Sequence, residues 1–175
     1  LLSFVNNTPA QPYFAGDTHR HQQAPGTVGR TISHDDLGFA HLVWTNQFDQ
    51  SSYHAFYNVW DPVLGEFLVQ MGMQVDIEIR ATAAGQTTLS SGFCFPAFHA
   101  QATGQTTLRP VAAIDFLPQA GAFTGFAPSG MTNTSKGYPQ IAHTANGDLH
   151  MVSRVLQLET ADPQPLLYSR GTPMF

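Results

Sequence analysis

Four side chains of the sequence could together form a surface that binds a ligand. They comprise an aromatic ring, an imidazole and two cations, and they are Arg30, Trp44, His99 and Arg154. An indole offers a flat apolar platform, an imidazole forms hydrogen bonds, and a guanidinium pairs with carboxylates. We expect this mixture to suit a carbohydrate or an acidic ligand. Ordinary packing of loops is the alternative explanation of the same residues.

The sequence contains eight histidines, so a metal site has to be considered. His19 and His21 could place two imidazoles on one side of a strand, or they could belong to a solvated segment. Two histidine pairs recur with the same separation along the chain, and these are His41 with His150 and His34 with His143. Because recurrence indicates a structural role, we expect these histidines to form hydrogen bonds within their own repeats. We predict neither a metal nor a cofactor.

Two further candidates have simple structural explanations. Asp35 and Asp36 precede a glycine turn, but a calcium loop needs more oxygen ligands than the segment DDLG offers, so we expect them to cap the turn. Cys94 lies in the apolar stretch GFCFPAF, with no activating base nearby in the sequence. We expect Cys94 to be a buried apolar residue rather than a nucleophile.

The elements that position these residues follow from an internal repeat. Gly38, Gly92 and Gly147 are almost evenly spaced along the chain. Pro62 and Pro118 both lie in segments of the form P-x-x-G-x-F, and a third proline follows at nearly the same interval in the segment GTPMF. These recurring landmarks indicate three units of about 55 residues.

Within each unit the local signals are those of strands. Asn146-Gly147 is a strong signal for a two-residue hairpin. The inner segments are apolar on both faces, as in a sheet that lies between other sheets, and they are FAHLVWTN, CFPAFHA and LHMVSRVL. A repeat of this length with four strands is typical of a β-propeller blade, and a two-sheet β-sandwich is the alternative.

We therefore predict an all-β fold of three four-stranded antiparallel blades, a partial β-propeller from a ring of six blades. An extended segment is expected at residues 1–25, followed by blades at about 26–79, 80–135 and 136–175. Side chains expected to be buried between the sheets include Val43, Trp44, Phe98 and Val152. Three blades cannot close a ring, so we expect the remaining blades of a longer polypeptide, or a second copy, to complete it.

Composition excludes two classes of partner. The 175 residues carry a net charge of −5 and no basic run, so a nucleic-acid partner is not expected. No stretch approaches the length of about 18 apolar residues that a membrane span requires. The first residue is Leu and the N-terminus is not an intact signal peptide. We expect the chain to be processed or to be a piece of a longer protein.

Several segments resemble sialidase-like (BNR-type) propellers, in particular the repeats of large secreted bacterial proteins. They are GRTISHDDLGFAHLVWTN followed by YNVWDPVLGEF, and PQIAHTANGDLHMVSR followed by LLYSRGTP. The resemblance covers residues 26–175, although the Asp-box spacing of that family is altered. It implies six or seven blades and a secreted or cell-surface location in a bacterium.

The resemblance also raises the possibility of glycoside hydrolysis of the sialidase type. That chemistry needs an arginine cluster, a Tyr–Glu nucleophile pair and an acid/base Asp, and no segment places a Tyr beside a Glu with three Arg. We therefore predict a non-catalytic binding or adhesion module, which could recognise carbohydrate. A sialidase-like hydrolase fragment and a purely structural spacer are the alternatives.

Overall fold

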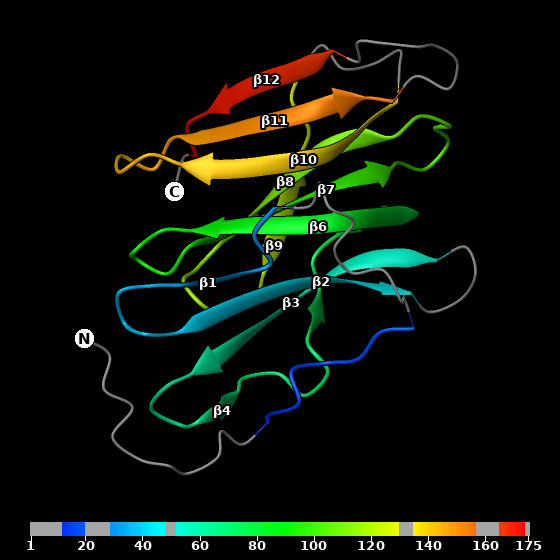
Figure 1. Cartoon of the computed structure of the whole chain (residues 1–175). Helices are drawn as coiled ribbons and strands as arrows, with labels where there is room; N and C mark the ends of the chain where they lie inside the picture. The colour runs from blue at the N-terminus through cyan, green and yellow to red at the C-terminus, as the bar shows by residue number, and fades with distance from the viewer. Residues whose placement is uncertain (1–11, 20–28, 48–51, 130–134, 157–164, 174–175) are drawn as a thin grey trace.

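The computed structural model describes residues 12–19, 29–47, 52–129, 135–156 and 165–173. Every helix or strand element in these ranges is a β-strand. The strands form three antiparallel sheets that follow one another in space in the order of the sequence (Figure 1). The predicted all-β class, with three antiparallel sheets as successive blades, is confirmed. The number of blades in a complete ring stays a prediction.

Sheet A comprises β1 (Ile32–His34), β2 (Ala40–Gln47), β3 (Tyr53–Asp61), β4 (Glu66–Phe67) and β5 (Met73–Gln74). Sheet B comprises β6 (Arg80–Thr88), β7 (Cys94–Gln101), β8 (Arg109–Asp115) and β9 (Phe123–Phe126). Sheet C comprises β10 (Lys136–His143), β11 (Leu149–Val155) and β12 (Leu166–Gly171). Only sheet B has the expected four strands. Sheet A gains a fifth because β4 is short and β5 pairs with another part of β3, and sheet C has three among the described residues.

The recurring glycines form the same turn in every sheet. The φ angles of Gly38, Gly92 and Gly147 are +87°, +92° and +83°, in the left-handed region that glycine enters without a steric cost. Each glycine N–H donates to the carbonyl three residues earlier, at 3.2, 2.9 and 2.9 Å, and the acceptors are Asp35, Leu89 and Thr144. The even spacing of these glycines in the sequence is therefore the spacing of equivalent turns.

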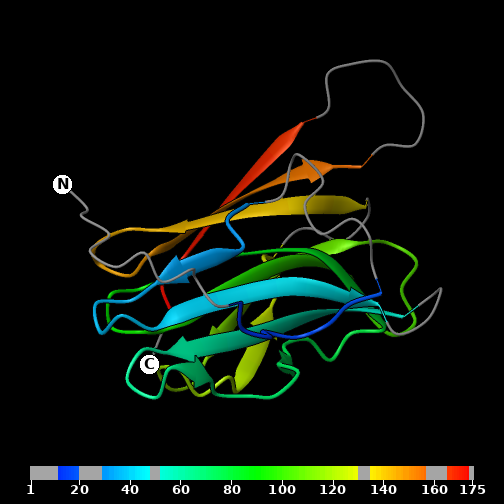
Figure 2. The ribbon, with the colours of Figure 1, turned by 60° about the horizontal axis from the view of Figure 1, so that its bottom comes forward.

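The sheets pack face to face, and Figure 2 shows sheets A and C on opposite sides of sheet B. We call the face of a sheet that points in the direction from A to C its front face, and the opposite face its back face. Val43 and Tyr57 on the front of sheet A pack with Cys94 and Phe98 on the back of sheet B, in one buried core. Val43 and Phe98 are therefore buried as predicted.

Two other side chains predicted to be buried are only half-buried. Trp44 lies on the back of sheet A and Val152 on the front of sheet C, and neither face is covered by another described sheet. In β11, Leu149 and Met151 line the space between sheets B and C. Because successive side chains of a strand point to opposite faces, Val152 points away from sheet B, to the front of sheet C. The prediction was wrong here because it treated all three sheets as inner sheets.

Of the predicted N-terminal segment, residues 1–11 and 20–25 lie outside the described residues. Residues 12–19 run along the back of sheet A, where Tyr13 contacts Trp60 with ring centroids 4.3 Å apart. This segment therefore covers part of a face that was expected to meet another blade.

Candidate binding site

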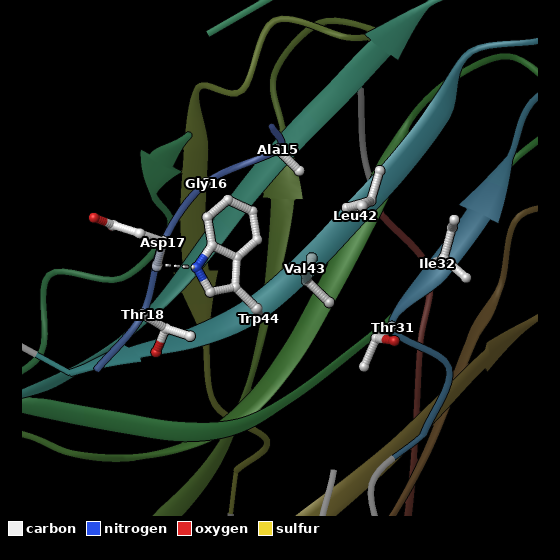
Figure 3. A pocket seen from close by; sticks show the side chains of 9 residues that line it. All are labelled: Ala15, Gly16, Asp17, Thr18, Thr31, Ile32, Leu42, Val43 and Trp44. Carbon is white, nitrogen blue, oxygen red and sulfur yellow. Dashed lines mark hydrogen bonds between the residues drawn. The ribbon is translucent and has the colours of Figure 1, made fainter. Parts of the chain in front are cut away.

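The candidate site is a pocket beside Trp44 on the back of sheet A. Along β2, Val43 is buried toward sheet B, whereas Leu42 and Trp44 are half-buried and face away from it. The pocket has a volume of about 400 Å³ and opens to solvent (Figure 3). Its lining comes from the N-terminal segment and from the first two strands, namely Ala15, Gly16, Asp17, Thr18, Thr31, Ile32, Leu42, Val43 and Trp44.

Hydrogen bonds hold the N-terminal segment against the sheet. The indole Nε1 of Trp44 donates to the carbonyl of Asp17 at 3.0 Å, as Figure 3 shows. The amide Nδ2 of Asn58 donates to the carbonyl of Ala15 at 2.7 Å. Because the polar edge of the indole is bound to the segment, the orientation of the ring is fixed before any ligand arrives.

Two glycines allow the backbone to approach the Trp44 ring closely. A Cβ atom placed on Gly16 would lie 2.4 Å from the indole, and one placed on Gly72 would lie 2.3 Å from it. Any larger residue at either position would push the ring out of its place. Sequence reasoning missed this role, because neither glycine belongs to the set that recurs between the units.

The chemistry of the pocket is mostly apolar with polar groups at its margin. Trp44, Leu42 and Ile32 supply aromatic and aliphatic surface and Thr31 supplies a hydroxyl, whereas the carboxylate of Asp17 points away from the indole (Figure 3). Ligand sites commonly combine an apolar wall with a few polar groups that set orientation. A sugar ring matches this pattern, since it has an apolar face and hydroxyl groups around its edge.

Arg30 precedes the pocket residue Thr31 but is engaged with other sheets. Its carbonyl accepts a hydrogen bond from the backbone N–H of Gln86 in β6, at 2.7 Å. Burial lowers the pKa of His143 in β10, and the positive charge of Arg30 lowers it further. Arg30 thus contacts β6 of sheet B through its backbone, and its exposed side chain acts on His143 in β10 of sheet C.

His99 and Arg154 meet at one aromatic ring, that of Tyr138 in β10. The imidazole of His99 is buried, and its Nδ1 accepts a hydrogen bond from the backbone N–H of Tyr138 at 3.0 Å. The guanidinium of Arg154 lies over the Tyr138 ring, 5.0 Å from its centroid. The structure therefore brings together two of the four predicted site residues at the Tyr138 ring of sheet C, while Trp44 lies on the back of sheet A.

The recurring histidines are structural, as expected. His41 Nδ1 lies 2.7 Å from the hydroxyl of Tyr57, and His150 Nδ1 lies 2.7 Å from the hydroxyl of Tyr168. Both bonds are within one sheet. His143 differs from the prediction, because its Nδ1 contacts the Thr87 hydroxyl of sheet B at 2.7 Å and so joins two sheets.

The other polar candidates have structural roles in the described part of the chain. Asp35 Oδ1 accepts the backbone N–H groups of Leu37 and Phe39, so it caps the first turn. Cys94 is fully buried, and burial raises the pKa of its thiol. No group of three or more His, Cys, Asp or Glu side chains among the described residues could hold a metal. His19 is exposed, and His21 lies outside the described residues.

A buried carboxylate that the sequence did not reveal is Asp76, just after β5. His54 Nδ1 contacts its Oδ1 at 2.9 Å, the Ala55 N–H donates to its Oδ2 at 2.7 Å, and Ser52 Oγ lies 3.2 Å from His54 Nε2. Burial raises the pKa of Asp76 despite these bonds. Ser52, His54 and Asp76 contact one another in the sequence serine, histidine, aspartate, as in a hydrolytic triad. Ser52 and His54, however, line neither the Trp44 pocket nor the pocket beside Asp76. We interpret these hydrogen bonds as a structural link that joins the start of β3 to the segment leading into β6.

The pocket beside Asp76, of about 200 Å³, lies between sheets A and B and also contains Glu78. Arg109 Nη2 donates to Glu78 Oε1 at 2.6 Å, and both Asp76 oxygens accept hydrogen bonds from the protein. These two carboxylates are therefore engaged in structural contacts, which does not favour the two-carboxylate chemistry of a glycoside hydrolase.

Comparisons with known proteins give a distant structural likeness. No protein-family model matches the sequence, and no curated protein matches it significantly. A solved structure described as an endo-arabinase from Bacteroides thetaiotaomicron VPI-5482 superposes with a TM-score of 0.49 and 9% identity. The match covers 87% of this chain and 58% of that one, so the chain spans little more than half the length of that protein. No helix in the described ranges is both long and apolar enough to cross a membrane.

Proposed function

We propose that this chain is a non-catalytic binding module that recognises carbohydrate through the pocket beside Trp44. The observation that carries the proposal is the indole itself, which stands at an open pocket of about 400 Å³ with its edge bonded to Asp17. An aromatic ring held in place stacks on the apolar face of a sugar with little loss of conformational entropy. The hydroxyl of Thr31 would then help to select among sugars by hydrogen bonding.

The proposed setting is a secreted or cell-surface protein with sialidase-like (BNR-type) repeats. The glycine turn that recurs in all three sheets supports the assignment of repeats, and the sequence segments quoted above support the family. We further propose that these blades belong to a larger ring, completed by remaining blades or by a second copy. The support is that Leu166 and Tyr168, on the uncovered side of sheet C, are 71% and 62% exposed.

A glycan array followed by affinity measurement tests the binding proposal. We expect the protein to bind one class of oligosaccharide, and Trp44→Ala to weaken that binding by about 30-fold, the loss typical of a central aromatic contact. Tyr168→Ala is the matched control, since it removes an exposed aromatic ring from sheet C and should leave affinity unchanged. An array without any binder, or a Trp44→Ala variant of full affinity, would refute the proposal and favour a structural spacer.

A further inference from the structure

One end of the molecule displays an unusual set of apolar side chains. We call it the apolar rim, and it consists of Leu37, Val63, Leu64, Phe116 and Leu117. These five side chains are between 61 and 88% exposed. They lie at the tips of the β1–β2, β3–β4 and β8–β9 turns, and Figure 1 shows the first two of these turns at the same end of the sheets. Single exposed apolar residues are common, but a contiguous group marks an interaction site.

Direct contacts join these turns into one surface. A Cβ atom placed on Gly38 would lie 3.6 Å from Cγ of Pro62, so the first two turns touch. The side-chain amide of Gln119, in the β8–β9 turn, donates to Asp35 Oδ2 at 2.5 Å. The three turns that carry the apolar rim are therefore neighbours across sheets A and B.

Each turn is also held rigid by an aspartate. Asp61 Oδ1 accepts the N–H groups of Val63 and Leu64 at 2.7 and 3.0 Å. Asp115 accepts the N–H groups of Gly121 and Ala122 at 2.9 and 3.0 Å, and Asp35 caps the β1–β2 turn in the same manner. Because the tips are already ordered, burying them in a partner costs little conformational entropy.

The composition of the rim distinguishes between a protein and a lipid partner. Binding hot spots in protein interfaces are rich in Trp, Tyr and Arg and poor in Leu and Val. The three turns, residues 35–39, 61–66 and 115–122, contain no Trp, Tyr, Arg or Lys, and their tips are Leu, Val and Phe. Side chains of this kind on protruding turns are suited to enter the hydrocarbon boundary of a bilayer.

The charge around the rim limits the kind of lipid. Asp36 and Glu66 are exposed in these same turns, and the net charge of the chain is −5. Anionic headgroups would repel these carboxylates. We propose that the apolar rim is a docking surface for a zwitterionic lipid surface, into which the five tips insert.

The apolar content of the rim is sufficient for reversible binding. The five side chains contain about 22 carbon atoms, compared with about 14 in a myristoyl chain, which by itself gives marginal, reversible membrane binding. Since only part of each tip enters the bilayer, we expect an affinity similar to that of a single acyl chain. Further contacts would be needed for stable attachment.

Vesicle flotation of the whole chain tests this inference. We expect flotation with phosphatidylcholine vesicles, and a partition coefficient at least about 10-fold lower for the double variant Leu64→Glu/Leu117→Glu, given the cost of placing charge at the bilayer surface. Leu166→Glu is the matched control, because Leu166 is at least as exposed as Leu64 and Leu117 but lies on sheet C, and this variant should float like the wild type. Vesicles that contain one third phosphatidylserine should bind at most about half as much protein as pure phosphatidylcholine vesicles.

Three outcomes would overturn the inference. They are no flotation with phosphatidylcholine, flotation that the rim variant retains, and flotation that requires phosphatidylserine. The first would leave a protein as the partner of the rim. Circular dichroism and urea unfolding of the variants establish that they are folded, which is expected because all of the changes are on exposed side chains.

Discussion

The same pair of residues occurs in two environments in this protein. His41 and Tyr57 are hydrogen-bonded on the front of sheet A and are fully buried under sheet B. His150 and Tyr168 form the equivalent bond on the front of sheet C, where Tyr168 is 62% exposed. A buried polar group must keep its partner because water cannot replace it. One His–Tyr pair is buried and the equivalent pair is exposed, so the effect of burial on stability can be measured by comparing the two.

Removing the hydroxyl group from each tyrosine should reveal this difference. Tyr57→Phe leaves the buried His41 Nδ1 without a partner, so we expect the free energy of unfolding to fall by about 1–3 kcal/mol. Tyr168→Phe lets water replace the lost hydroxyl and should cost less than about 0.5 kcal/mol. Urea unfolding measures both values, and equal costs would contradict the burial of the first pair.

The stability should also depend on pH through His41. Burial is the main effect and lowers the pKa of His41, while Asp35 opposes it. The folded protein therefore takes up a proton at His41 less readily than the unfolded chain does. The contribution to stability is fully present above the ordinary pKa of about 6.5 and is lost as the pH falls below that value.

We expect wild-type stability to decline between pH 7.5 and 5.5 more steeply than that of His41→Asn, as measured by urea unfolding. His150→Asn is the control and should retain the wild-type slope. Burial raises the pKa of Asp76 and Asp115, and a carboxyl group with a raised pKa stabilises the folded state as the pH falls. Because this effect opposes that of His41, the slope of the wild type has to be compared with that of the variant. Identical slopes for the wild type and His41→Asn would contradict a neutral, buried His41.

At the scale of elements, turns and bulges recur as well as strands. The first strands of sheets B and C carry equivalent bulges. The bulge in β6 lies at Thr82–Gly85, and the bulge in β10 lies at Gly137–Gln140. Each bulge contains a non-glycine residue of positive φ, Ala83 at 58° and Tyr138 at 53°. Bulges of this kind bend a strand and increase its twist. The separation of Ala83 and Tyr138 in the sequence equals that of the turn glycines Gly92 and Gly147.

The sequence predicted the turns better than the bulges. Glycine marks a left-handed turn directly, so Gly38, Gly92 and Gly147 were visible as landmarks. Ala83 and Tyr138 have no such signature, because Ala and Tyr seldom adopt positive φ and share no chemistry with each other. The two-residue strand β5 was also missed, since two residues show no alternation that could be distinguished from a loop.

A glycine pair in sheet C tests whether the turn conformation matters. Gly147 has a φ of +83° and Gly171 does not have a positive φ, while a Cβ atom on either would meet nothing closer than 3.8 Å. Gly147→Ala should therefore lower the free energy of unfolding by about 1–2 kcal/mol through backbone strain alone. Gly171→Ala should be neutral or slightly stabilising. Thermal or urea unfolding compares them, and equal effects would argue against the left-handed turn.

At the scale of the molecule, the arrangement of faces decides which residues can act together. Trp44 and His99 lie in the second strands of sheets A and B, β2 and β7. The two residues nevertheless lie on opposite faces, since Val43 rather than Trp44 faces the next sheet while His99 itself faces sheet C. A shift of one residue reverses the direction of a side chain in a strand. The sequence could therefore predict the sheets and Trp44 as a candidate, but not the composition of the pocket around it.

The stacking of successive repeats is the central claim, and aromatic contacts between sheets test it most directly. The rings of Tyr57 in β3 and Phe123 in β9 meet edge to face, with centroids 5.0 Å apart across the boundary between sheets A and B. The rings of His99 in β7 and Tyr138 in β10 do the same at 5.2 Å across the boundary between sheets B and C. Nuclear Overhauser effects between ring protons of both pairs should be observed in the folded chain. Their absence, or contacts of Tyr57 with rings of sheet C instead, would contradict three blades stacked in sequence order.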